Sequence, residues 1–385
     1  MEDKMSTENS GELRVEIAQE SDSEKLKQFV VQQPFLVNSP MELVVNRKGS
    51  FFDKYRLQTE DFVTHKMVND QNEIEGIASM LFRKTLLNGE ENLVGFATDL
   101  RISNSRQAIV QWPEKLLPAM TDTAAQKGCD YVFSILNTNQ TQAYNALIRP
   151  RSSRRNIPRY YFYRKYDLVT IHGKVPFTDL PFLNSIKISP MGENDLEPLA
   201  AYLKSKSLHK PLSFPYSADL LLERFRTWKG FHKENFLIAK DRHNNIIGSV
   251  APWKASQILE ISVLNYRGFG ETIYTFSRFF SYFKFVKRLP PVGGKLNMKF
   301  LTHLYADNPD IFAALLAEVF RTTQPDELLS YAHFHKTPLT LPPRNFLVSQ
   351  IPFSIYAVLP PEKPLPDFLQ LHKVTPPPEI EPILV

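Results

Sequence analysis

Two stretches with nearly the same pattern, about two hundred residues apart, constrain the fold more than any single residue. The first reads FATDLRISN at 96–104 and the second FLTHLYADN at 300–308, so Phe, Thr, Leu and Asn recur in register. Each stretch is followed by a helix-like segment and then by a second apolar strand. An internal repeat of this kind predicts two copies of one α/β module, each built around a strand–helix–strand unit.

Other segments extend the repeat. Each half opens with a short strand and a helix whose first turn is acidic, which capping and the helix dipole favour. Each half then has two strands joined by a polar turn, and each closes with an aromatic strand. These pairs are 13–26 and 186–199, 62–82 and 236–250, and 160–171 and 353–358. The order predicts an α/β (α+β) protein in which each module is a mixed, mostly antiparallel sheet flanked by helices.

The chain divides into four parts on this interpretation. We expect a disordered N-terminus at 1–12, a first module at 13–175, a second module at 176–358 and a proline-rich tail at 359–385. The second module carries an insertion of roughly 40 residues, at about 254–295. Phenylalanines recur at helical spacing within this insertion. We expect that helix to pack them over the second module rather than to lie on a membrane.

Composition narrows the class of protein. Cys129 is the only cysteine among 385 residues, which excludes an intrachain disulfide and favours a reducing compartment. The polar start and the absence of a long apolar run predict a cytoplasmic protein without a signal peptide or transmembrane segment. The net charge of +5 allows anionic ligands, but we do not expect nucleic acid as a partner. The sequence says nothing firm about oligomeric state.

The order of elements resembles the GCN5-related N-acetyltransferase (GNAT) fold, in tandem as in some bacterial acyltransferases. LVGFATDLRI at 93–102 is similar to its fourth strand, 105–126 to its pyrophosphate-binding helix, and CDYVFSIL at 129–136 to its fifth strand. The resemblance covers about residues 13–358. It implies an N-acyltransferase that uses acetyl-CoA or a related acyl-CoA as cosubstrate in the first module. The acceptor would be an amine of a small molecule or peptide.

The family's acetyl-CoA signature, Gln/Arg-x-x-Gly-x-Gly/Ala, falls on Arg106 to Gln111. Arg106 is kept, but Ile109 and Gln111 replace both glycines, whose lack of a Cβ lets backbone amides approach the pyrophosphate. The first half has about eight extra residues before its helical Pro113, whereas the second half lacks this turn. We therefore expect no CoA in the second half. The alternative is a GNAT-fold protein that has lost catalysis and serves as a binding or interaction protein.

The candidate site residues follow from the resemblance. Asp99 is interpreted either as a general base or as part of an Asp–Arg ion pair, because Arg101 lies two positions away on the strand. Tyr144 is the implied proton donor to the leaving thiolate. No metal is expected, because the histidines lack a carboxylate motif. The implied cofactor-binding residues are Leu100, Arg101, Ile102, Arg106, Gln107, Ala108, Ile109, Val110, Gln111 and Asn139.

Overall fold

The computed structural model describes residues 12–33, 39–87, 89–139, 145, 147–148, 158–370 and 376–384. The predicted disordered N-terminus lies outside the described residues except for Glu12. Within the described residues, no helix is long and apolar enough to cross a membrane.

The first half contains the expected elements and one strand that the sequence did not reveal, β2. Its elements are β1 (Arg14–Ile17), α1 (Ser23–Val31), β2 (Met41–Arg47), α2 (Asp53–Arg56), β3 (Phe62–Val68), β4 (Ile74–Leu87), β5 (Glu90–Ile102), α3 (Arg106–Gln126), β6 (Tyr131–Asn137) and β7 (Arg159–Lys174).

The second half repeats this order without a counterpart of β2 and adds β11 and α7 within the predicted insertion. Its elements are β8 (Lys187–Pro190), α5 (Leu196–Ser207), α6 (Ala218–Thr227), β9 (Leu237–Lys240), β10 (Ile246–Trp253), β11 (Leu259–Tyr266), α7 (Phe269–Ser281), β12 (Lys295–Ala306), α8 (Pro309–Thr322), β13 (Glu327–Phe334) and β14 (Phe346–Leu359).

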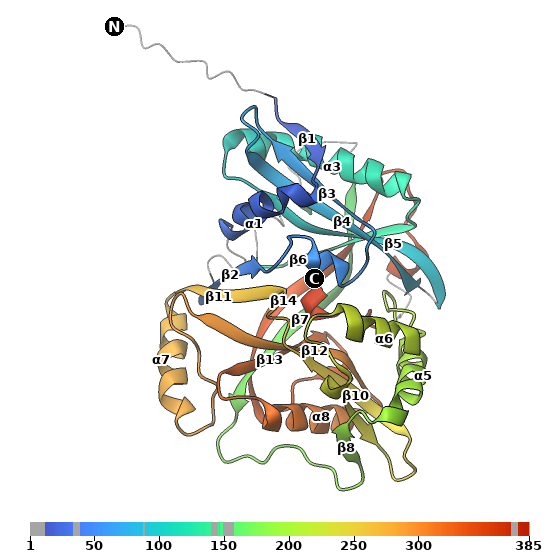
Figure 1. Ribbon diagram of the computed structural model, residues 1–385, viewed down its shortest axis with the longest axis vertical. Helices are drawn as coiled ribbons and strands as arrows, with labels where there is room; N and C mark the ends of the chain where they lie inside the picture. The colour runs from blue at the N-terminus through green and yellow to red at the C-terminus, as the bar shows by residue number, and fades with distance from the viewer. Residues whose placement is uncertain are drawn as a thin grey trace.

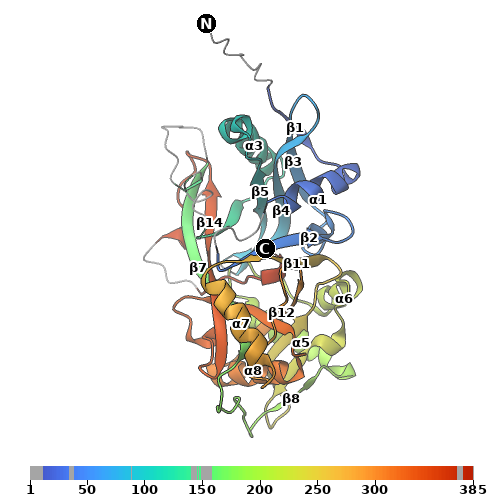
Figure 2. The same cartoon turned by 90° about the vertical axis from the view of Figure 1, so that its left-hand side faces the viewer.

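All strands join one 14-stranded sheet with the main order β1-β3-β4-β5-β6-β14-β7-β13-β12-β10-β9-β8. The two closing strands change places: β14 pairs with β6 of the first half, and β7 pairs with β13 of the second. Figures 1 and 2 show β7 and β14 passing between the two halves. Among the described residues, β5–β6 and β12–β13 are the only parallel pairs, so the mixed and mostly antiparallel fold class is confirmed.

Two further segments bind the halves together. The inserted strand β11 pairs along its length with β2 of the first half, from Leu259 opposite Arg47 to Tyr266 opposite Met41. The tail returns to the middle of the molecule, where Ile383 and Leu384 are buried (Figure 1). The tail is therefore packed into the fold over 376–384, and both segments border the space between the halves.

Candidate active site

The repeated stretch is distorted at the same position in both halves. Ile77 and Ser79 of β4 face Arg101 and Thr98 of β5, so Asp99 and Leu100 lie opposite a single β4 residue. This two-to-one arrangement is a β-bulge. Asp99 has a φ of 52°, in the left-handed region that non-glycine residues rarely adopt. Strain of this kind is concentrated at functional sites.

The bulge lies where β5 and β6 part. Their parallel pairing runs from Val94 opposite Tyr131 to Ala97 opposite Ser134 and stops there. Beyond that point β6 continues to pair with β14, and β5 continues to pair with β4. A gap therefore opens between the ends of two neighbouring strands, and residues 98–101 and 135–137 line a cavity there.

This cavity has a volume of about 310 Å³ and extends from the gap into the space between the halves. Most of its wall is apolar, and the part between the halves comes from β2, β11, β12, β13 and β14. The apolar lining includes Met41, Leu43, Val45, Leu259, Ile261, Leu296, Met298, Leu328 and Ile351. Its charged lining residues are Arg47, Lys54, Asp99 and Arg101 at the bulge, together with Arg83 and Glu381. A second hollow of about 250 Å³ beside α3 shares Ala97, Leu117, Met120 and Tyr160 with the cavity. The space thus reaches from α3 past the strand gap.

Asp99 is held in a buried polar cluster. Arg47 of β2 forms a close ion pair with its Oδ2, and the Tyr55 hydroxyl donates to the same oxygen at 2.8 Å. The ion-pair partner is thus Arg47, not the nearby Arg101 that the strand spacing indicated. Burial alone would raise the pKa of the Asp99 carboxyl, but the charges of Arg47, Lys54 and Arg101 hold it well below its usual range. The group therefore stays ionised and accepts a proton poorly.

Lys54 also lines the cavity. Burial lowers the pKa of its amine to about 8, with Asp99 opposing the shift and the charges of Arg47 and Arg101 adding to it. An amine with this pKa is partly neutral near physiological pH, as a general base must be. Lys54 was not predicted from the sequence, because nothing in the local pattern places residues 53–56 against β5.

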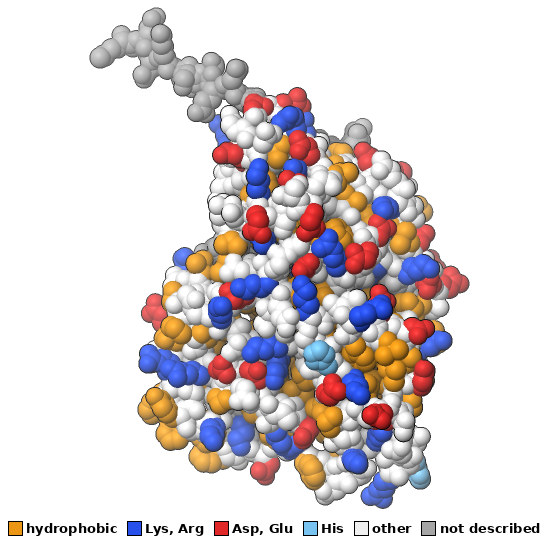
Figure 3. All heavy atoms as spheres, viewed as in Figure 1, with side chains coloured by type: hydrophobic (Ala, Val, Ile, Leu, Met, Phe, Trp, Pro, Cys, Tyr) orange, Lys and Arg blue, Asp and Glu red, His pale blue; other side chains and the backbone are white. Residues whose placement is uncertain are grey.

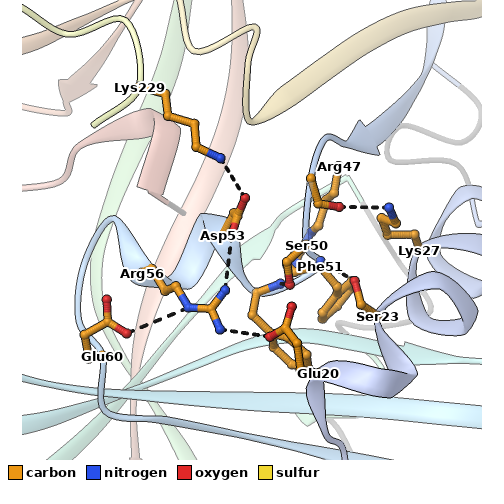
Figure 4. A network of polar contacts seen from close by, with 12 residues as sticks. Glu20, Ser23, Lys27, Arg47, Ser50, Phe51, Asp53, Arg56, Glu60 and Lys229 are labelled. Atoms are coloured by element: carbon orange, nitrogen blue, oxygen red, sulfur yellow. Dashed lines mark hydrogen bonds and ion pairs between the residues drawn. The ribbon is translucent and has the colours of Figure 1, made fainter. Parts of the chain in front are cut away.

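A network of ion pairs fixes the short helix α2, which carries Lys54 and Tyr55 (Figure 4). Arg56 contacts Asp53 at 3.1 Å and Glu20 at 2.9 Å, while Lys229 reaches Asp53 from the second half at 3.0 Å. Both halves of the chain therefore hold the helix that presents Lys54 to the cavity.

The predicted phosphate-binding residues form the first turns of α3. The helix begins at Arg106, and Ser105 caps it by accepting from the Ala108 amide at 3.1 Å. The extra residues of the first half lengthen this helix, so Pro113 lies inside it and the expected separate turn is absent. Ile109 and Val110 are exposed, with 55% and 57% of their surface accessible.

A carboxylate already lies beside this helix start. Ser103 and Ser105 both donate their hydroxyls to Oε2 of Glu75, the latter at 2.7 Å. Gln111 accepts from the Leu13 amide at 3.2 Å and thereby ties α3 to the start of the chain. Glycine is absent and a negative charge is present, so this turn is a poor site for pyrophosphate.

The remaining predicted residues separate into two groups. Leu100 and Arg101 border the cavity beside Asp99, whereas Ile102 packs against the apolar cluster under α3. Arg106, Gln107, Ala108, Ile109, Val110 and Gln111 do not line the cavity. Asn139 is exposed, and its neighbour Asn137 lines the cavity instead. Tyr144 lies outside the described residues, so its role as proton donor stays a prediction.

The second half has the same bulge, but its space is filled. Thr302 and Tyr305 face Ala251 and Ser249, and His303 has a φ of 50°. The His303 amide donates to Oε1 of Glu381 at 2.9 Å. A residue of the tail therefore takes the position opposite this bulge.

Neighbouring side chains fill the rest of the space beside this bulge. Tyr216 and Tyr305 donate hydrogen bonds from their hydroxyls to Glu379, and Arg224 contacts the buried His303 ring.

The other two histidines considered as metal ligands, His333 and His335, lie away from this bulge. Nε2 of His335 is 2.9 Å from Oδ2 of Asp167. Among the described residues, no three His, Cys, Asp or Glu side chains gather as a metal site requires.

Comparison with known proteins identifies the fold. No family model and no curated protein sequence matches the chain. A GCN5-related glucosamine N-acetyltransferase region of a fungal β-N-acetylglucosaminidase superposes with a TM-score of 0.54 at 11% identity, over 90% of this chain and 38% of that one. N-myristoyltransferase from Saccharomyces cerevisiae, solved with bound myristoyl-CoA, superposes with a TM-score of 0.53 at 9% identity. The match covers 90% of this chain and 82% of that one.

A GCN5-related N-acetyltransferase from Sphaerobacter thermophilus gives a TM-score of 0.49 at 12% identity, over 92% of this chain and 98% of that one. At such identities a likeness shows the fold alone. The chain has the GNAT fold, as the order of its elements indicated.

Proposed function

We propose that the protein is an N-acyltransferase that takes an acyl-CoA into its first half and transfers the acyl group to an amine. The observation that carries the proposal is the asymmetry of the two bulges. The bulge at Asp99 opens on a cavity, whereas the equivalent bulge at His303 is closed by Glu381. Among the described residues, the bulge at Asp99 lines this cavity and the bulge at His303 does not.

The second half also indicates what the first bulge binds. There the His303 amide donates to a carboxylate oxygen at 2.9 Å. Because the two bulges share one geometry, the Asp99 amide would donate in the same way to the carbonyl oxygen of a thioester in the first half. Such a donor stabilises the negative charge that develops on that oxygen when an amine attacks.

The pantetheine and acyl end of an acyl-CoA fits this chain better than the pyrophosphate end does. Backbone groups along 98–101 and 135–137 border the strand gap, where they could bind the amides of a pantetheine arm. The cavity beyond is larger than an acetyl group needs, and its apolar wall fits a longer acyl chain or an apolar acceptor. The pyrophosphate end fits poorly, because Glu75 lies at the start of α3. Affinity would therefore come from the pantetheine and acyl parts.

Lys54 is the candidate base for this reaction. Its neutral amine would take a proton from the acceptor ammonium, whose nitrogen then attacks the thioester carbon. The new C–N bond forms as the C–S bond breaks, and the CoA thiolate leaves and is protonated. Asp99, fixed by Arg47 and Tyr55, would hold Lys54 and the bulge in place rather than accept the proton itself.

A titration of thermal stability tests the binding step. Acetyl-CoA and a series of longer acyl-CoAs should raise the melting temperature, and the longer chains should do so at lower concentration. Arg106→Glu, which adds a second negative charge at the start of α3, should weaken the effect. The same charge change at Arg242, exposed in the turn between β9 and β10, should leave it unchanged. No rise with any acyl-CoA would refute the proposal.

The second candidate is a binding protein of the same fold without catalysis. The glycine-free start of α3 and its carboxylate neighbour Glu75 favour it. Release of free CoA thiol in the presence of a panel of amines separates the two candidates. Binding of acyl-CoA without thiol release at any pH would support the binding protein.

A further inference from the structure

The helix α7 presents its aromatic residues to solvent, which reverses the packing expected from the sequence. Only Gly270 and Ser277 of the helix are buried, while Ile273 and Tyr274 pack partly against the cluster of Leu43, Leu296 and Leu328. Small residues thus face the protein. Phe269, Phe276, Phe279, Tyr282 and Phe283 lie on the outer side, with between 47% and 85% of their surface exposed.

Ring contacts connect six phenylalanines of this region into one aromatic face, namely Phe177, Phe276, Phe279, Phe280, Phe283 and Phe285. Ring contacts connect Phe276 with Phe280 at 4.1 Å, Phe279 with Phe283 at 5.9 Å, and Phe283 with Phe285 at 6.5 Å. Phe177, in the loop after β7, extends the chain through Phe285 at 5.8 Å and is 97% exposed. Single exposed apolar residues are ordinary, but a contiguous aromatic face indicates an interaction surface.

The charges on and around α7 are mostly positive. Arg278, Lys284 and Arg288 are exposed beside the aromatic face, and Glu271 is the only acidic residue between 267 and 288. Lys287 does not contribute, because its amine is turned inward to the carbonyl oxygens of Thr323 and Gln324. Hydrophobic and basic side chains gather over α7 on the left of Figure 3.

We propose that the aromatic face of α7 docks on a lipid surface that carries anionic headgroups. Aromatic rings with flanking Lys and Arg are the composition of helices that lie in the plane of a membrane interface. A second copy of this chain fits less well, because a twofold contact would bring the three cations of each copy together. The helix also packs against β11, whose Leu259 and Ile261 line the cavity. Docking would place that cavity close to the lipid.

Co-sedimentation with vesicles tests the proposal on the full chain. The protein should pellet with vesicles of phosphatidylcholine mixed with phosphatidylglycerol, much less with phosphatidylcholine alone, and less as salt rises. The double change Phe279→Ser and Phe283→Ser should lower the partition coefficient at least about tenfold, since two exposed rings would lose their burial in the interface. Arg278→Glu with Lys284→Glu should weaken binding to the anionic vesicles by a similar factor.

Fluorescence gives a readout that does not depend on pelleting. Tryptophan placed by Phe279→Trp should shift its emission to the blue on anionic vesicles. Phe162→Trp, at a residue on β7 with 56% of its surface exposed, is the matched control and should not shift. The proposal is overturned if the wild-type chain fails to pellet at low salt, or if the double serine variant pellets as well as wild type. It is also overturned if wild type is a dimer that this variant makes monomeric.

Discussion

Replacement of Lys54 by Met tests the proposed base. Burial lowers the pKa of the Lys54 amine to about 8. At pH 7 about one amine in ten is then neutral, against roughly one in 2,500 for an ordinary lysine, a difference of about 200-fold. The wild-type rate of CoA release should therefore rise about tenfold per pH unit up to about pH 8 and then level off. Lys54→Met should lower the rate by about 10² or more and remove this dependence.

The same shift has a consequence for stability that needs no substrate. The folded pKa lies below the unfolded value, so the lysine destabilises the fold while it is protonated, below pH 8. That cost declines as pH rises from about 8 to about 10.5. Lys54→Met should accordingly be more stable than wild type at pH 7, by up to about 3 kcal/mol, and this advantage should shrink in alkali.

Urea unfolding at several pH values measures the difference. Lys54→Arg stays charged throughout this pH range. It should therefore show neither the rise in the rate of CoA release up to about pH 8 nor the gain in stability in alkali. If Lys54→Met kept the wild-type pH–rate profile, or gained no stability at neutral pH, the assignment of Lys54 as a buried base would be wrong.

Three other changes give independent tests. Burial raises the pKa of Glu381 to about 7, so its carboxyl destabilises the fold once it is ionised. The stability of wild type relative to Glu381→Gln should therefore fall between pH 4.5 and pH 7, and Glu381→Gln should be the more stable above pH 7 by up to about 3 kcal/mol in thermal unfolding. Glu75→Gln should tighten CoA binding several-fold in calorimetry, and Glu73→Gln, two positions away, should not. Gly270→Ala should cost at least about 2 kcal/mol in urea unfolding, because its Cβ would lie 1.7 Å from the Pro40 carbonyl oxygen. An unchanged stability or CoA affinity in any of these variants would contradict the contact on which its prediction is based.

The likeness of the two halves extends to a backbone feature that the sequence did not predict. Residues that align between the two copies, Asp99 with His303, share a β-bulge and a positive φ. Strand exchange was not predictable, because β7 and β14 have similar aromatic patterns and either could close either half. β2 was missed for a related reason: the partner that gives it a place, β11, lies about two hundred residues away in an insertion.

The site was predicted in part, for physical reasons. Asp99, Leu100 and Arg101 were identified through the strand on which they lie, and the structure places them at the cavity. Arg47 and Lys54 come from segments without a recognisable motif, so only tertiary contact reveals them. The phenylalanines of α7 were assigned inward because periodicity shows that a helix has an apolar face but not what covers that face.

We propose that the chain binds one acyl-CoA, in its first half. Isothermal titration with a CoA thioester measures this directly through the number of sites per chain. We expect one, because the bulge at Asp99 faces the cavity while Glu381 occupies the bulge at His303. Two sites per chain, or no binding of any acyl-CoA, would contradict the account.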